Sequence, residues 1–149
     1  MNKLPSEAVA VVGNIDPDAY AAAAYTTDYI PMRDFRRFMA IVQAGDIVST
    51  GTVDAKLTAY TDAVGGGAFD IPGAAITQMT QAGTDSNKQA VINLNTDTLA
   101  GSVRYTHLRL TVTLGTAGAD MGAVVLGFDP RSAPASDSDA STVDSIASA

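Results

Sequence analysis

Few side chains in this sequence could act as an acid, a base or a nucleophile. His107 is the only histidine and Glu7 the only glutamate among 149 residues, and cysteine is absent. A catalytic triad, a histidine dyad or a histidine-ligated metal would therefore have to use His107. The alternation around it instead places His107 on the polar face of a strand beside Arg109, and no Gly-x-Ser-x-Gly nucleophile elbow occurs. We expect no catalytic residue, and the chain is predicted not to be an enzyme.

Pairs of oxygen-bearing side chains two residues apart could begin a calcium loop. Three such pairs occur, at Asp16 and Asp18, Asp85 and Asn87, and Asp137 and Asp139. None continues into the twelve-residue calcium pattern, and turn capping explains them. The triple glycine at 65–67 is not followed by Lys-Ser or Lys-Thr, so it indicates a hairpin loop rather than a phosphate cradle. Without cysteine a thiolate zinc site is excluded too, and we expect no metal and no cofactor.

The basic residues point to a protein partner. Arg33, Arg36 and Arg37 form a cluster close to Tyr29, in a chain whose net charge is −7. A nucleic-acid face is conceivable, but a polyphosphate would be repelled by the chain as a whole. We therefore expect these residues, with Arg131, to bind acidic surfaces of a protein partner.

Composition indicates one domain with a thin core. A chain of about 150 residues forms a single core. Hydrophobic residues make up 46% of the chain, but much of that fraction is alanine and tryptophan is absent. There are 15 aspartates to one glutamate, a bias towards turns and caps rather than helix surfaces. With neither a leader-like start nor a membrane-length apolar run, the chain is expected to be made in the cytoplasm.

Apolar periodicity predicts mainly strands. The clearest lie at 52–59, 88–94, 103–114 and 121–128, with shorter ones at 69–71 and 76–81. In the third of these the apolar phase slips near Thr106, which predicts either a β-bulge or an outer face that covers Val103 and Tyr105.

Three other segments are less regular. Residues 35–43 fit either a helix or a strand with apolar residues on both faces, and we favour the strand. Residues 16–24, with Pro17 near their start, indicate one or two helical turns. Residues 25–32 are expected to be extended, with Pro31 at an edge or a strand end.

These elements predict an all-β fold, a β-sandwich that is jelly-roll-like or Ig-like, with at most one short helix. The sandwich is expected over residues 16–131. Extended arms are expected at 1–15 and at 132–149, the latter rich in Ser, Ala and Asp. The arms are predicted to contact neighbouring subunits.

Much of the sequence resembles structural proteins of tailed-bacteriophage virions. The segments that carry the resemblance are 25–32 (YTTDYIPM), 35–42 (FRRFMAIV), 44–46 (AGD), 53–57 (VDAKL), 69–71 (FDI), 75–78 (AITQ), 91–94 (VINL) and 104–113 (RYTHLRLTVT). These motifs are structural rather than catalytic. The resemblance implies a β-sandwich in or on a phage head, or near its neck.

The resemblance implies a capsid decoration, or cement, protein that bridges neighbouring major capsid subunits. Its expected partners are the major capsid protein and copies of itself, as a trimer, with no nucleic acid and no membrane. A head-to-tail connector or tail protein is the first alternative. A carbohydrate-binding host-attachment module is the second, with Tyr20, Tyr25, Tyr29, Tyr60 and Tyr105 as its aromatic candidates.

Overall fold

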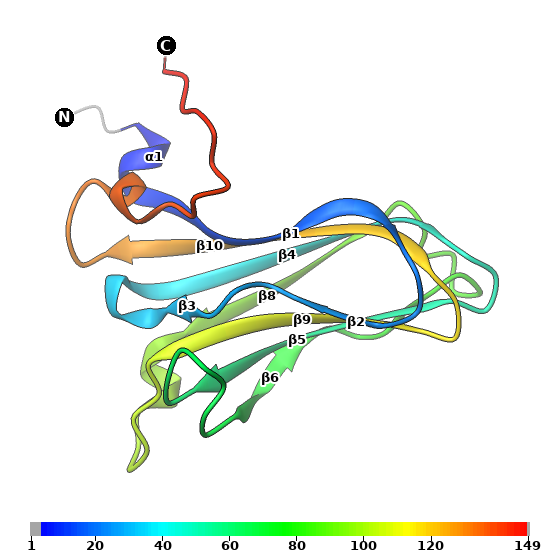
Figure 1. Ribbon diagram of the computed structural model, residues 1–149, viewed down its shortest axis with the longest axis horizontal. Coiled ribbons are helices and arrows are strands. Elements are labelled where there is room, and N and C mark those ends of the chain that lie inside the picture. The colour runs from blue at the N-terminus through cyan, green and yellow to red at the C-terminus, as the bar shows by residue number, and fades with distance from the viewer. Residues whose placement is uncertain (1–3, 149) are drawn as a thin grey trace.

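The computed structural model describes residues 4–148, which form two antiparallel β-sheets packed face to face (Figure 1). The helices and short 3-10 segments are α1 (Pro5–Ala8), η1 (Met32–Asp34), η2 (Thr96–Leu99) and η3 (Ala135–Ser138). The strands are β1 (Val9–Tyr20), β2 (Ala24–Thr26), β3 (Ile30–Pro31), β4 (Phe35–Ile47), β5 (Thr52–Tyr60), β6 (Phe69–Ala75), β7 (Met79–Thr80), β8 (Gln89–Asn95), β9 (His107–Gly115) and β10 (Ala119–Pro130).

The order of the strands identifies the fold as a jelly roll. One sheet has the order β1-β10-β4-β8, and the other has β2-β9-β5-β6 with β3 beside β9 and β7 beside β5. Among the eight strands that define these orders, β3 and β7 being left out, every connection in the chain crosses from one sheet to the other except the one that joins β5 to β6. This arrangement of two interlocked Greek keys is the double-sheet jelly roll, which decides between the two sandwich types expected from the sequence.

The core lies between the sheets and follows the alternation of the strands. Leu108, Leu110 and Val112 of β9 are fully buried. Phe38 and Val42 of β4, in the other sheet, belong to the same core. Alanines supply much of the rest, at positions 10, 40, 44, 55, 59, 74, 119, 123 and 135. Small side chains let the two sheets approach closely but bury little apolar area each, so the thin core expected from composition is present.

The stronger strand predictions are confirmed. Strands β5 and β10 cover the segments expected at 52–59 and 121–128, and β8 matches the one expected at 88–94 with a shift of one residue; β10 lies inside its sheet, between β1 and β4. Residues 35–43 form a strand rather than a helix, because β4 pairs along its length with both β10 and β8. The shorter strands appear as β6 and β7.

The prediction for 103–114 was wrong at its start. Strand β9 begins only at His107, so no bulge at Thr106 is needed to explain the slip in apolar phase. Val103 lies in the preceding loop and is 47% exposed, whereas the Tyr105 ring stacks on the Phe69 ring with centroids 5.2 Å apart. The two apolar residues thus belong to the loop before the strand, and Tyr105 packs over β6.

The helical turns expected at 16–24 were also wrong, because β1 runs on to Tyr20. The strand accommodates Pro17 through an irregular register against β10 between Ile15 and Asp18. Proline lacks a donor, and such positions on an edge strand are where a sheet tolerates it. Gly122 of β10 faces Pro17 there, and a Cβ on Gly122 would lie 3.0 Å from the Pro17 Cα.

Helix α1 and the C-terminal segment around η3 lie beside each other at one end of the sandwich (Figure 1). Of the expected N-terminal arm, residues 1–3 lie outside the described residues and residues 9–15 belong to β1, so the sandwich starts earlier than expected. The C-terminal segment folds back on β1: the Val11 N–H donates to Asp139 Oδ1 (2.8 Å) and the Ala140 N–H to the Val11 carbonyl (2.7 Å). Ala135 is buried, whereas most of residues 141–148 are exposed.

Candidate interaction surfaces

The side chains considered for catalysis do not form a catalytic arrangement. His107 is half-buried, with Nδ1 2.8 Å from Thr106 Oγ1. The nearby Asp62 carboxylate accepts hydrogen bonds from the backbone N–H groups of Gly66 and Val64, which lower its pKa. Asp62 therefore caps the glycine loop, as turn aspartates do. Across residues 4–148, no group of three or more His, Cys, Asp or Glu side chains is placed to hold a metal ion.

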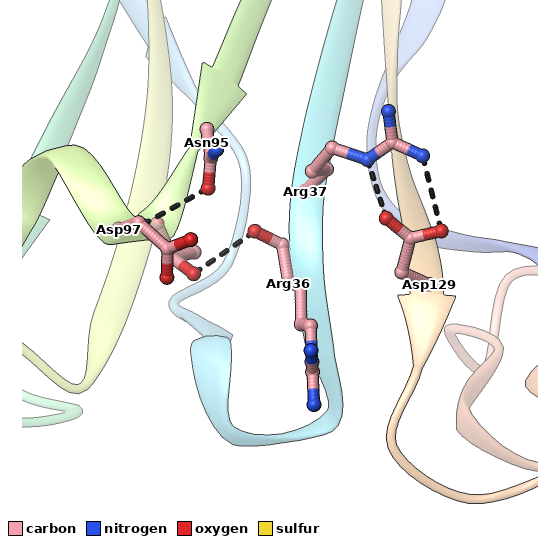
Figure 2. A network of polar contacts seen from close by, with 6 residues as sticks. Arg36, Arg37, Asn95, Asp97 and Asp129 are labelled. Atoms are coloured by element: carbon pink, nitrogen blue, oxygen red, sulfur yellow. Dashed lines mark hydrogen bonds and ion pairs between the residues drawn. The ribbon is translucent and has the colours of Figure 1, made fainter.

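The arginines gather at one end of the sandwich, where β4 begins and β10 ends. Arg37 forms a bidentate ion pair with Asp129, whose pKa it lowers, and the Arg37 Nη2 to Asp129 Oδ1 distance is 3.0 Å (Figure 2). Arg36 points away from this pair, along its strand towards the preceding loop (Figure 2). The Arg36 carbonyl accepts a hydrogen bond from Thr96 Oγ1 (2.9 Å) and so ties β4 to η2. Arg37 is thus committed within the chain, whereas the Arg36 guanidinium projects into solvent.

Tyr29, expected to act with these arginines, belongs to a different cluster. Its hydroxyl accepts a hydrogen bond from Arg109 Nη1 (3.2 Å), and the Arg109 guanidinium lies 4.6 Å from the centre of its ring. Tyr60 meets the same ring edge-on, with centroids 5.1 Å apart. Tyr29 therefore packs on the six-stranded sheet, where it holds Arg109 in place.

A groove at the arginine end collects three of the cations. Arg33, Arg104 and Arg131 line it together with Met32, Thr96, Asp97, Leu99, Ala100, Gly101, Val103, Tyr105 and Thr106, and its volume is about 660 Å³. The Arg33 side chain is 83% exposed, and its Nε lies 3.4 Å from Asp34 Oδ1. Within residues 4–148, neither Arg104 nor Arg131 forms an ion pair. This arginine groove therefore combines apolar lining residues, here termed its floor, with three arginines, here termed its rim, and one carboxylate, that of Asp97.

A second surface is the outer face of the four-stranded sheet, the side turned away from the core. Strand register places the apolar residues in rows: Val11, Leu126 and Met39 are neighbours across three strands. One row further along, Val124 and Ile41 are followed by Val91. The whole outer face carries Val9, Val11, Met39, Ile41, Val91, Val124, Leu126 and Phe128, all half-buried except the 51% exposed Val91.

An apolar outer face is unusual for an antiparallel sheet that borders water. Such a sheet normally alternates apolar residues towards the core with polar residues towards solvent. Strands β4 and β10 are apolar on both faces in their central parts, at 38–42 and 123–128, which is typical of strands covered on both sides. The outer face therefore has the character of a contact surface.

The sequence contained signals for both surfaces that the expected site residues did not use. Arg104 was missed because it lies about 70 positions from Arg33, and only the packing of loop 96–106 beside η1 brings the two to one groove. The outer face was visible as continuous apolar runs at 38–42 and 121–128. Their rows across four strands, however, require the register.

No protein-family model matches the sequence, and no curated protein matches it. Solved structures of similar shape include that of infectious bursal disease virus, Gt strain, at 11% identity and a TM-score of 0.49, which covers 85% of this chain. The chain spans about a third (34%) of the length of that virus chain. Empty particles of cowpea mosaic virus match at 12% identity over 88% of this chain and 86% of theirs, with a TM-score of 0.44. A pilus of Bacillus endospore appendages matches at 16% identity over 85% of this chain and 92% of its own, with a TM-score of 0.33.

Proposed function

We propose that this chain is a non-catalytic structural subunit of a phage head, which decorates the capsid and stabilises it by bridging neighbouring major capsid subunits. The observation that carries the proposal is the apolar outer face, which extends across all four strands of one sheet. The phage setting is taken from the resemblance of the sequence to tailed-phage virion proteins.

The energetics favour a covered outer face. Each Å² of apolar surface removed from water contributes roughly 25 cal/mol, so a partner that covers this patch gains several kcal/mol without a single charged contact. The thin alanine-rich core leaves the isolated sandwich with modest stability of its own. Binding to a lattice then adds stability by mass action, because only the folded chain binds.

The charged groups suit a protein partner better than a nucleic acid or a membrane. The chain carries −7, and its arginines are confined largely to one end. None of the helices among residues 4–148 is long and apolar enough to cross a membrane. Arg36 has no ion pair within residues 4–148, and its exposed guanidinium can pair with carboxylates of a capsid subunit.

The test is reconstitution on particles that lack this chain. Such particles are expected to lose resistance to heat or chaotropes and to regain it on addition of the purified chain. The variants Val124→Asp and Leu126→Asp, each of which places a carboxylate in the outer face, should fold and fail to restore resistance. Val64→Asp is the matched control, because Val64 is 85% exposed in a loop remote from that face.

Particles that keep full resistance without this chain would contradict a stabilising role. Copy number separates the proposal from its first alternative: hundreds of copies per particle fit a decorating subunit, whereas about a dozen or fewer fit a connector or tail ring. If Leu126→Asp restored resistance as fully as the original chain, the contact with the capsid would not involve the outer face.

A further inference from the structure

The arginine groove combines exposed cations with exposed apolar surface, which suits an anionic partner that also has an apolar group. Val103 on its floor is 47% exposed, and Leu99 and Tyr105 are half-buried beside it. Arg104 and Arg131 on its rim have no ion pair within the described part of the chain. Burial of the exposed apolar floor by an apolar side chain is favourable. Carboxylates beside that side chain would also form charge-assisted hydrogen bonds with the arginines.

The opposite end of the same molecule carries such a group. Val48 is 55% exposed at the tip of the turn that follows β4. Asp46 precedes it by two residues, and Asp120 lies at the start of the neighbouring strand β10; both are exposed, and neither forms an ion pair within residues 4–148. Asp18 joins them from β1, since it lines the same shallow hollow as Asp120.

The turn around Val48 is held firmly by its backbone. The Val48 N–H donates to the Gly118 carbonyl (3.1 Å), and the Gly51 N–H donates to the Val48 carbonyl (2.7 Å). A Cβ on Gly51 would lie 2.7 Å from that carbonyl oxygen, so the tight turn requires glycine there. The valine side chain is therefore presented in a fixed position, which reduces the entropy lost on docking.

The two features cannot meet within one molecule. Arg33 lies just before β4 and Arg131 just after β10, whereas Val48 follows the far end of β4. Strand β4 has 13 residues. At about 3.3 Å per residue, the groove and the turn are about 40 Å apart. Only a second copy can bring them together.

We propose that copies of this chain associate head to tail, the Val48 turn of one copy docking in the arginine groove of the next. Val48 covers the apolar floor, and Asp46 and Asp120 face Arg104 and Arg131. The contact joins two different surfaces, so it is heterologous: three copies form a closed ring if the rotation closes, and otherwise an open filament grows.

This inference rests on the proposed function, a subunit that acts in many copies on a particle, and names the surface through which those copies associate. It leaves the outer face of each copy free for the capsid. The two proposals fail separately, because this contact is measured with the purified chain in solution and the decorating role is measured on particles.

The first measurement is the mass of the purified chain against concentration, by analytical ultracentrifugation. The original chain should associate, and association should weaken as salt rises from about 0.05 M to about 0.5 M, since the rim contacts are screened. Val48→Asp and the double variant Arg104→Glu/Arg131→Glu should each raise the dissociation constant roughly tenfold or more. Val64→Asp and Arg36→Glu are the matched controls, because neither residue lines the groove or the turn. Thermal unfolding of every variant checks that it folds.

Mixing the two defective chains gives the decisive result. The Val48→Asp chain keeps an intact groove, and the Arg104→Glu/Arg131→Glu chain keeps an intact turn, so an equimolar mixture should form a heterodimer of one copy each and nothing larger. A mixture that stays monomeric overturns the proposal. So does an original chain that stays monomeric up to millimolar concentration, or a control variant that weakens association as much as Val48→Asp.

Discussion

Substitution of Gly127 by alanine tests the packing on which the arginine end depends. Gly127 lies in β10, where the Phe35 ring rests on its Cα: an added Cβ would lie 2.6 Å from both Cγ and Cδ2 of the ring, and 2.9 Å from Cδ1. The ring has little room to move, because Phe35 is 1% exposed and meets Phe38 edge-on with centroids 6.1 Å apart. The extra methyl group therefore overpacks the core.

The size of the effect follows from two opposing terms. Overpacking of a well-packed core costs about 1–3 kcal/mol. Replacement of glycine by alanine lowers the entropy of the unfolded chain and returns about 0.4–1 kcal/mol. We expect Gly127→Ala to lower the free energy of unfolding by about 1–2 kcal/mol, a drop in Tm of roughly 2–8 °C for a domain of this size.

Urea unfolding followed by circular dichroism measures this free energy, with two matched comparisons. Gly101→Ala should have no effect or a slight stabilising one, because a Cβ there meets nothing within 4 Å. In a Phe35→Leu background, Gly127→Ala should cost little or nothing, since the smaller side chain makes room, and the difference is the coupling energy of the pair. An equal loss in both backgrounds, or a Gly127→Ala chain as stable as the original, would refute the packing argument.

Three further outcomes are expected. The hydrogen bond from Lys56 lowers the pKa of Asp70. The contribution of Asp70 to stability is therefore complete above about pH 4 and is lost as the pH falls through the folded pKa. The Tm difference between the original chain and Asp70→Asn should shrink as the pH is lowered from about 7 to about 2.5. Thr27→Val should cost about 1–3 kcal/mol in thermal unfolding, because the buried Thr27 hydroxyl accepts from the Leu110 N–H, and Thr27→Ser should retain most of the stability. Deletion of residues 132–149 should lower the Tm by uncovering the β1 edge, and an unchanged Tm would mean that the C-terminal segment does not pack there.

Strands with one polar face could be predicted from the sequence alone. Alternation of apolar and polar residues in β5 and β8 predicted both strands within a few residues. It failed where a local pattern was overridden by pairing: Pro17 suggested a helix start, but β10 offers β1 a full-length partner, and a register irregularity absorbs the proline. The prediction from alternation also failed at Val103. Valine favours strands, but Val103 lies in a loop because strand pairing begins only at His107.

The candidate surfaces were anticipated in part. The cluster of Arg33, Arg36 and Arg37 was apparent from its spacing, but its members have different surroundings: Asp129 neutralises Arg37, while Arg33 lines the groove. Such differences depend on residues almost a hundred positions away in the chain. They cannot be inferred from a local pattern.

The amino-acid sequence by itself determined the class of the fold and the poverty of the chain in catalytic groups, because strand periodicity and residue types are local properties. The strand order that makes a jelly roll was decided by tertiary structure, since several pairings of the same strands would satisfy the alternation equally well. Tertiary structure alone also assembled the outer face and the arginine groove. Both consist of side chains from segments that become neighbours only when sheet register and loop packing are fixed.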